Sequence, residues 1–413
     1  MPRTIHVVGA GLAGLAAAVR LAGRGESVVV YEAAGRAGGR CRSYHDPVLD
    51  MVIDNGNHLL LSGNHAALNY LETIGAGGQL VGPATAELAF IDLADGERWT
   101  LRINAGRLPW WILDRKRRVP GTRARDYLSF ARLLSASADK TICETMPCAG
   151  KLYERLARPF WIAALNTDPR EASASLAGAV VRETLAAGGK ACRPLIARDG
   201  LGTVFVEPAL RFLEERNAKV AFGHRLRRVD FQQDKVTALD FGEDGLAIGD
   251  DAVILAVPPM VAAELVPDLA TPTEFRAIIN AHFRMPPPAG LAPITGVVNG
   301  TIEWLFTFPD RLSVTISAAD RLLDVAREVL AQDIWNDVAT VTGLSKTPPP
   351  WQIVRERRAT FAGTPAEDAK RPAATTAWRN LVLAGDWTRT GLPATIEGAI
   401  RSGNLAADLV ARS

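Results

Sequence analysis

The chain has 413 residues, 48% of them apolar and 22% charged, and its 47 basic and 45 acidic residues leave a formal net charge of +2. These values are typical of a globular protein with two or three structural units, and they give no reason to expect a nucleic-acid partner. No apolar run reaches the roughly 18 residues that span a bilayer, and no signal-peptide pattern precedes the first predicted strand. We therefore expect a cytoplasmic protein, and a peripheral contact with the inner face of the membrane stays open.

The first forty residues predict a Rossmann-type βαβ unit that binds a dinucleotide. Gly9 allows a tight turn out of the first strand, Gly11 lets a pyrophosphate approach the backbone, and Gly14 lets the helix pack against the strand. The N–H groups at the start of the helix then face the phosphates. Glu32 ends the second strand, where its carboxylate can accept hydrogen bonds from a ribose diol. The predicted elements are a strand at 5–8, a helix at 15–22 and a strand at 27–31.

The next segment, Gly35-Arg36-Ala37-Gly38-Gly39-Arg40, resembles the Gly-Gly-Arg extension of the amine oxidase and phytoene desaturase flavoprotein superfamily. Adjacent glycines let the backbone close on a ligand, and an arginine offers a planar fork to phosphate oxygens. The resemblance implies FAD, not NAD, as the dinucleotide, and it assigns Arg36, Gly38, Gly39 and Arg40 to FAD binding. The sequence has no second Gly-x-Gly-x-x-Gly, which disfavours a disulfide reductase with its own NAD(P)H domain.

Two further segments narrow the resemblance to one family. The run Ile53-Asp54-Asn55-Gly56-Asn57-His58-Leu59-Leu60-Leu61 is similar to the squalene-associated FAD-dependent enzymes, the hydroxysqualene dehydroxylases. The segments 158–167 and 171–175 resemble the ALNT and EAS blocks of the same family. The resemblance implies an amine oxidase-like α/β fold, in which a Rossmann-type FAD-binding domain carries an inserted mixed α+β substrate domain.

The same resemblance suggests roles for the residues around His58. Gly56 and Asn57 are expected at the cofactor. His58 is expected near the flavin, where an imidazolium is a reasonable acid, and a structural histidine bonded to the backbone is the alternative. Asp54 is expected to orient the local turn.

A Trp- and Arg-rich segment at 107–120 has two interpretations. Trp110 and Trp111 stand just before Arg115, Lys116, Arg117 and Arg118. Tryptophan favours the membrane–water interface and cations favour anionic headgroups, so a membrane contact from Trp110 and Trp111 to Arg118 is one interpretation. A buried aromatic cluster beside a solvated basic turn is the other.

The four cysteines, Cys41, Cys143, Cys148 and Cys192, are expected to be free or buried thiols. None belongs to a Cys-x-x-Cys pair, and no histidine cluster accompanies them, so neither a metal site nor a redox dithiol is predicted.

The middle of the chain is predicted to form the substrate domain. Apolar spacing indicates helices at 122–165, 169–190 and 320–343, and strands within 290–318. Strands near 219–222 and 252–257 return to the FAD-binding domain, and the resemblance suggests that the backbone of Val229 contacts adenine. The predicted FAD-binding domain comprises 1–85, 195–265 and 375–413, and the predicted substrate domain comprises 86–194 and 266–374.

The C-terminal segment is expected to close the FAD site. A strand at 381–384 leads to Gly385 and Asp386, and a helix begins near Thr395. By the resemblance, Asp386 binds the ribityl chain or lies near the pyrophosphate, and the backbone at Ile396 faces flavin O2. A helix N-terminus there stabilises negative charge. Arg389 is a candidate to steer a leaving hydroxyl, with a surface role as the alternative.

The resemblance implies that the protein removes the hydroxyl group of hydroxysqualene reductively to give squalene. The allylic C–O bond ionises as its oxygen is protonated, and hydride from the flavin completes the product. The chain must then supply a proton donor and exclude bulk water. An FAD-dependent isoprenoid desaturase or amine oxidase is the alternative, and a non-catalytic flavin-binding scaffold is a third hypothesis. No motif identifies the electron donor.

Overall fold

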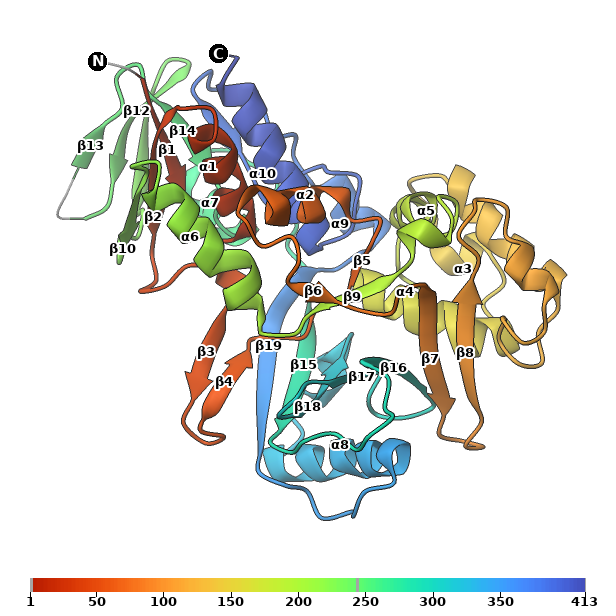
Figure 1. Cartoon of the computed structure of the whole chain (residues 1–413). Coiled ribbons are helices and arrows are strands. Elements are labelled where there is room, and N and C mark those ends of the chain that lie inside the picture. Colours follow the sequence, from red (N-terminus) through yellow and green to blue (C-terminus); the bar gives the residue numbers. More distant parts are fainter. Residues whose placement is uncertain (1–2, 243–244, 413) are drawn as a thin grey trace.

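The half of the protein that carries the glycine loop is built on a five-stranded parallel sheet, at the upper left of Figure 1. The computed structural model describes residues 3–242 and 245–412, so the two ends of the predicted FAD-binding domain, 1–2 and 413, lie outside the described residues. Every pair of neighbouring strands runs parallel, in the order β10-β2-β1-β14-β20. The strands are β1 (Thr4–Val8), β2 (Ser27–Glu32), β10 (Lys219–Phe222), β14 (Ala252–Leu255) and β20 (Leu381–Leu383).

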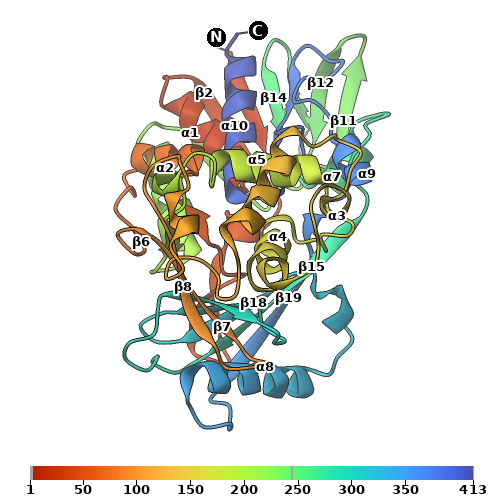
Figure 2. The same ribbon diagram turned by 90° about the vertical axis from the view of Figure 1, so that its right-hand side faces the viewer.

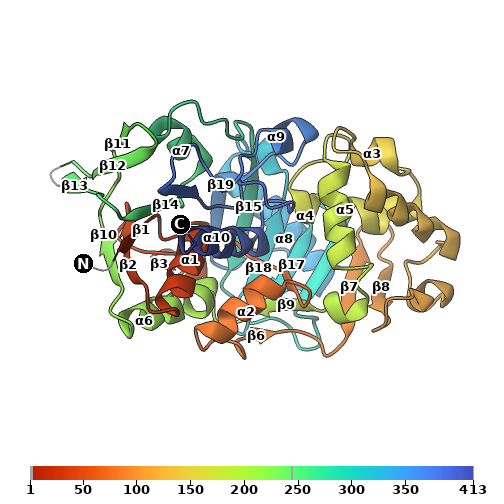
Figure 3. The same ribbon diagram turned by 90° about the horizontal axis from the view of Figure 1, so that it is seen from above.

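The first and last long helices of the chain pack side by side against this sheet (Figure 3). They are α1 (Leu12–Ala22) and α10 (Ile396–Val410). A Cβ atom added at Gly403 would lie 2.1 Å from the carbonyl oxygen of Ala13, so the two helices meet backbone to backbone. Only a glycine permits this approach. The segments near both ends of the chain therefore belong to one core.

A mixed seven-stranded sheet forms the lower half of the molecule, in the order β19-β15-β18-β17-β16-β7-β8. Neighbouring strands are antiparallel except β16 and β7, which run parallel. Helix α8 (Arg327–Thr342) covers one face (Figure 2), while Phe90, Trp304 and Phe306 pack against helical segments on the other. The strands are β7 (Ala86–Asp92), β8 (Arg98–Ile103), β15 (Phe275–Phe283), β16 (Ile294–Val298), β17 (Trp304–Thr307), β18 (Leu312–Ile316) and β19 (Trp351–Phe361).

The predicted fold class is confirmed: a Rossmann-type parallel sheet is combined with a mixed α+β half. The region 122–165, predicted to be helical, is a series of short helices, because Pro147 and Gly150, whose φ is 83°, interrupt the chain. The helices in this region are η3 (Ala124–Ser135), α3 (Ile142–Thr145), η4 (Tyr153–Ala157) and α4 (Arg158–Leu165). Helix α5 (Ala174–Glu183) follows them. The proposed residue boundaries between the two domains stay a prediction.

The remaining elements are short. Three small sheets join β3 to β4, β5 and β6 to β9, and β11 to β12 to β13. Among the described residues, no helix has both the length and the apolar character needed to cross a membrane. The elements are β3 (Ser43–Asp46), β4 (Met51–Asp54), β5 (Leu60–Leu61), α2 (His65–Thr73), β6 (Leu80–Val81), β9 (Pro194–Ala197), α6 (Glu207–Glu214), β11 (Arg228–Gln232), β12 (Lys235–Asp240), β13 (Gly245–Ala247), α7 (Pro259–Leu265) and α9 (Pro365–Ala369).

The expectation of four free cysteines is wrong for two of them. Cys143 and Cys148 form a disulfide, with their Cα atoms 5.3 Å apart, within the range that such a bond requires. Cys143 lies in short α3, which ends at Thr145, and the segment that follows brings Cys148 back to Cys143. Cys41 and Cys192 are buried free thiols, as expected, and burial raises the pKa of each.

Candidate functional site

The glycine loop after β1 is tight on one side and open on the other. Gly9 has φ of 105°, and a Cβ there would lie 2.4 Å from the carbonyl oxygen of Ala256. A Cβ at Gly14 would lie 1.9 Å from the Gly9 carbonyl oxygen, so both positions require glycine. At Gly11, by contrast, an added Cβ would meet no atom within 4 Å. Gly11 also precedes α1 without a side-chain cap, so the N–H groups of this helix start are available to a phosphate.

The Gly-Gly-Arg extension lies directly on this loop. Gly38 donates its N–H to the Ala10 carbonyl at 2.8 Å, and Gly38 and Gly11 form an isolated parallel bridge. A Cβ at Gly39 would lie 3.3 Å from the Cα atom of Gly11. Gly38 and Gly39 both have positive φ, at 105° and 55°, which explains why two glycines occur here. Arg36 is exposed at the edge of the same segment.

Glu32 is held at the end of β2 by two backbone N–H groups. Its carboxylate accepts from Ala10 and from Ala34, each at 2.8 Å. A carboxylate has further lone pairs, so Glu32 can still accept from a ribose diol. Val229 is buried in β11, in a separate sheet, and belongs to the same apolar cluster as Val8. Its contact with adenine stays a prediction. The backbone of His224 also lies at this edge and donates to the Glu32 carbonyl oxygen at 2.9 Å.

Arg40 and Asp386 join the two ends of the chain. The Arg40 guanidinium donates to the Asp386 carboxylate at 2.7 Å and to the Ala359 carbonyl oxygen at 2.6 Å. The Asp386 side chain is 6% exposed and the Arg40 side chain 45%. The charge of Asp386 raises the pKa of Arg40. Arg40 therefore neutralises a buried carboxylate while its side chain stays partly exposed.

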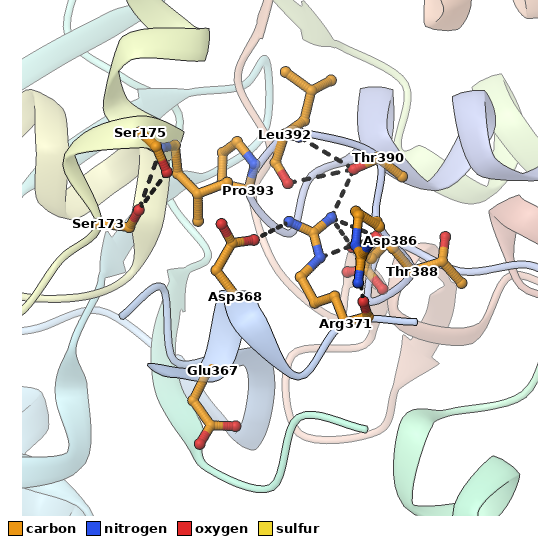
Figure 4. A network of polar contacts seen from close by, with 12 residues as sticks. Ser173, Ser175, Glu367, Asp368, Arg371, Asp386, Thr388, Thr390, Leu392 and Pro393 are labelled. Carbon is orange, nitrogen blue, oxygen red and sulfur yellow. Dashed lines mark hydrogen bonds and ion pairs between the residues drawn. The ribbon is translucent and has the colours of Figure 1, made fainter. Parts of the chain in front are cut away.

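A second, fully buried arginine holds the segment around Asp386 (Figure 4). Arg371 donates to the carbonyl oxygens of Thr388 at 2.9 Å and Asp386 at 3.1 Å, and it pairs with Asp368 at 2.8 Å. Gly385 is fixed by its N–H, which donates to Ser402 in α10 at 2.9 Å. Sequence reasoning missed Arg371, because no motif distinguishes it from a surface arginine.

Asn57 anchors the Gly56–His58 turn to the seven-stranded sheet. Its backbone N–H donates to Asn280 of β15 at 3.2 Å, and its side-chain amide donates to Thr315 of β18 at 3.2 Å. Ser313 donates to the Asn57 side-chain oxygen at 2.9 Å. A Cβ at Gly56 would lie 3.0 Å from the Asn280 amide nitrogen, so Gly56 allows this contact. The sheet residues that bind Asn57 belong to no sequence motif, so this contact could not be predicted.

The two predicted catalytic residues lie in different environments. His58 is partly buried, and burial together with the charge of nearby Arg40 lowers its pKa to about 4. Its ring is therefore neutral at pH 7, which does not support the imidazolium acid that we predicted. Arg389 is exposed, and its Nε donates to the Arg371 carbonyl oxygen at 3.3 Å. Asp54 accepts from Ser43 at 2.5 Å and from the Leu201 N–H at 2.8 Å, in agreement with a role in shaping the turn.

The start of α10 is capped from within the chain. Thr395 accepts from the Gly398 N–H at 3.0 Å, and Ile396 is the first residue of the helix. Glu397 does not serve its own helix alone: its carboxylate accepts from the N–H groups of Ala66 and Ala67, at the start of α2. Glu397 is therefore a structural carboxylate.

The Trp- and Arg-rich segment has both a buried aromatic residue and an exposed one beside its cations. Trp111 is buried and packs edge-on against Tyr127, with ring centroids 5.0 Å apart. Trp110, the preceding residue, is 63% exposed. Of the cations from Arg115 to Arg118, the first two are exposed and the last two are partly buried.

These features fit a flavin dinucleotide. An open space beside Gly11, an uncapped helix start, a fixed carboxylate at Glu32 and the partly exposed side chain of Arg40 match a pyrophosphate and a ribose. The N-terminus of α10 adds a positive dipole end from the opposite end of the chain.

The chain was compared with family models, curated proteins and solved structures. The family model for flavin-containing amine oxidoreductases matches residues 12–411. The hydroxysqualene dehydroxylase of Rhodopseudomonas palustris is 60% identical over 412 residues, covering 99% of each chain. That of Sinorhizobium fredii is 57% identical, covering 99% of this chain and 98% of its own. Among solved structures, cyclohexylamine oxidase from Brevibacterium oxydans has a TM-score of 0.72 at 17% identity, covering 100% of this chain and 99% of its own, which shows a common fold.

Proposed function

We propose that this chain, which belongs to the flavin-containing amine oxidoreductases and, within them, to the hydroxysqualene dehydroxylases, converts hydroxysqualene to squalene with FAD as its cofactor. The observation that carries the proposal is the 60% identity to a protein of that name over 99% of both chains. The dinucleotide cradle formed by Gly11, Glu32 and Arg40 supports it independently.

The chain's own residues bind and orient the cofactor. The backbone at Gly11 and the start of α1 hold the pyrophosphate, Glu32 accepts from a ribose hydroxyl, and Arg40 contacts a phosphate oxygen. Arg371 and Ser402 keep the Gly385–Asp386 turn in place beside it. When bound, FAD supplies the electron pair, as hydride, that replaces the hydroxyl group.

Loss of the hydroxyl group as water requires one proton at the leaving oxygen. Of the two predicted catalytic residues, His58 remains the candidate, because it is partly buried and near Arg40, whereas Arg389 is exposed. A neutral imidazole can donate its N–H to the leaving oxygen while its other nitrogen takes a proton from water. In this proposal His58 relays a proton and is not protonated beforehand.

A peripheral contact with an anionic membrane completes the proposal. Hydroxysqualene is a C30 isoprenoid alcohol and partitions into lipid. The exposed ring of Trp110 and the neighbouring cations Arg115 and Lys116 suit the interface of such a membrane. We propose the inner, cytoplasmic face as the site of this contact.

Anaerobic mixing of the photoreduced holoenzyme with hydroxysqualene tests the function. We expect the flavin absorbance to return as squalene forms, one mole per mole of flavin oxidised. Absence of reoxidation would refute the proposal. Reduction of the oxidised enzyme by squalene or by an amine would support a desaturase or an amine oxidase instead.

A further inference from the structure

The segment 107–134 forms an exposed surface that is both apolar and strongly basic. Leu108, Trp110, Leu113 and Leu128 are each more than 60% exposed. Between 107 and 132 the sequence has eight basic and two acidic residues, a surplus of six positive charges in a chain whose net charge is +2. The rest of the chain is therefore net negative. Exposed apolar groups in a ring of cations are the pattern of a contact with anionic lipid.

A pocket lies within this surface. It has a volume of about 290 Å³, and its lining residues include Arg115, Arg118, Arg123 and Gly121. In the described part of the chain, no carboxylate lies within ion-pair distance of these three guanidinium groups. Three unneutralised arginines around a small hollow suit a phosphate group.

Internal contacts hold the pocket and the apolar side chains together. Arg118 donates to the Ile112 carbonyl oxygen at 2.6 Å, which ties the pocket to η2 (Trp110–Leu113). Tyr127 accepts from the Val119 N–H at 2.9 Å and packs against buried Trp111. The surface is therefore a fixed structure, at the right-hand edge of Figure 1, away from α1 and α10.

We propose that Arg115, Arg118 and Arg123 bind the phosphate of an anionic phospholipid, while Leu108, Trp110 and Leu113 enter the acyl region beside it. The inference rests on the membrane contact proposed above and specifies its ligand and its residues. Free phosphate would account for the arginines but not for the exposed leucines and tryptophan. A second copy of this chain is the other possible occupant, and the experiment below includes a test for a dimer.

Co-sedimentation of the holoenzyme with vesicles tests the proposal. We compare vesicles of phosphatidylcholine with vesicles that contain about one quarter phosphatidylglycerol, and expect at least about tenfold tighter binding to the latter. Arg115→Glu with Arg123→Glu should remove that preference, and Trp110→Ser with Leu113→Ser should weaken binding about tenfold or more. Arg211→Glu and Val329→Ser, at exposed positions on α6 and α8, are the matched controls and should bind as the wild type does.

Several outcomes would overturn the proposal. The first is that the wild type binds neutral and anionic vesicles equally, and the second is that either pair of variants binds as tightly as the wild type. The third is that the controls lose as much binding as the variants. The fourth is that the wild type is a dimer and Trp110→Ser dissociates it. Inorganic phosphate that binds to the wild type while anionic vesicles do not would also refute a lipid ligand. Flavin absorbance verifies that each variant is folded. Squalene formation in detergent is measured separately, so a failure of lipid binding is distinguished from a failure of the proposed reaction.

Discussion

The guanidinium of Arg40 donates to the carboxylate of Asp386 at 2.7 Å, although 346 residues separate them in the sequence. Arg40 comes from the extension of the N-terminal βαβ unit, and Asp386 follows the last strand of the same sheet. The pair closes the proposed dinucleotide site, so its removal should affect FAD retention before it affects the seven-stranded half of the protein.

Replacement of Arg40 by alanine should therefore release FAD. The change removes the proposed phosphate contact and leaves the buried Asp386 carboxylate without its cation, so we expect FAD affinity to fall about tenfold or more and the free energy of unfolding to fall by about 1–3 kcal/mol. The ratio of flavin to protein absorbance after gel filtration measures the first effect. Arg379→Ala, an exposed arginine paired with Asp234 at 3.6 Å, is the control and should retain FAD.

Two glycines of one loop should respond differently to alanine. At Gly11 the added methyl group occupies open space, so the apoprotein should fold normally but bind FAD at least about tenfold more weakly. At Gly14 the methyl group would lie 1.9 Å from a carbonyl oxygen, so the fold itself should be lost. Circular dichroism of both apoproteins, with FAD titration of Gly11→Ala, separates the effects. Unchanged FAD affinity in Gly11→Ala would contradict the position assigned to the pyrophosphate.

His58 should contribute to catalysis without an ionisation near neutral pH. Because its pKa is lowered to about 4, kcat of the wild type should show no step from this group between about pH 6 and 8. His58→Gln should lower kcat about a hundredfold if the ring relays a proton, with little change in KM. An unaltered kcat would assign His58 a structural role.

Acid should destabilise the protein through His282. This fully buried ring contacts Ser313 at 2.8 Å, and burial lowers its pKa to about 3. The unfolded chain takes up the proton near pH 6.5 and the folded protein does not. The free energy of unfolding should therefore fall as pH decreases from about 6.5 towards 3, by at most about 1.4 kcal/mol per pH unit for this group. The free energy of unfolding, measured by urea titration at several pH values, should depend less steeply on pH in His282→Asn than in the wild type. In the control, His45→Asn at an exposed position, its pH dependence should be unchanged.

Thiol titration checks the disulfide between Cys143 and Cys148. The denatured, unreduced protein should react at Cys41 and Cys192 only, and reduction should expose two further thiols. Because the loop closed by this bond is short, Cys143→Ser with Cys148→Ser should cost only about 2 kcal/mol of stability. Four reactive thiols before reduction would contradict the pairing.

Local patterns in the sequence predicted the fold and the cofactor well. The structure places the glycine loop, Glu32 and the final helix near Thr395 where the sequence predicted them. The curated relatives confirm the family that the segment around His58 indicated. Contacts between distant segments were not predictable. Arg371 and Asn280 act through partners far away in the sequence, and nothing in their own neighbourhoods marks them. The Cys143–Cys148 spacing was visible, but its pairing depends on the turn after α3.

The backbone contact between Gly403 and Ala13 has a consequence for biosynthesis. A ribosome releases the first helix long before it has made the last one, so the emerging polypeptide lacks the partner against which α1 packs and the strand that ends at Leu383. We therefore expect FAD to bind only when translation is nearly complete. A chain that ends before residue 381 should be colourless.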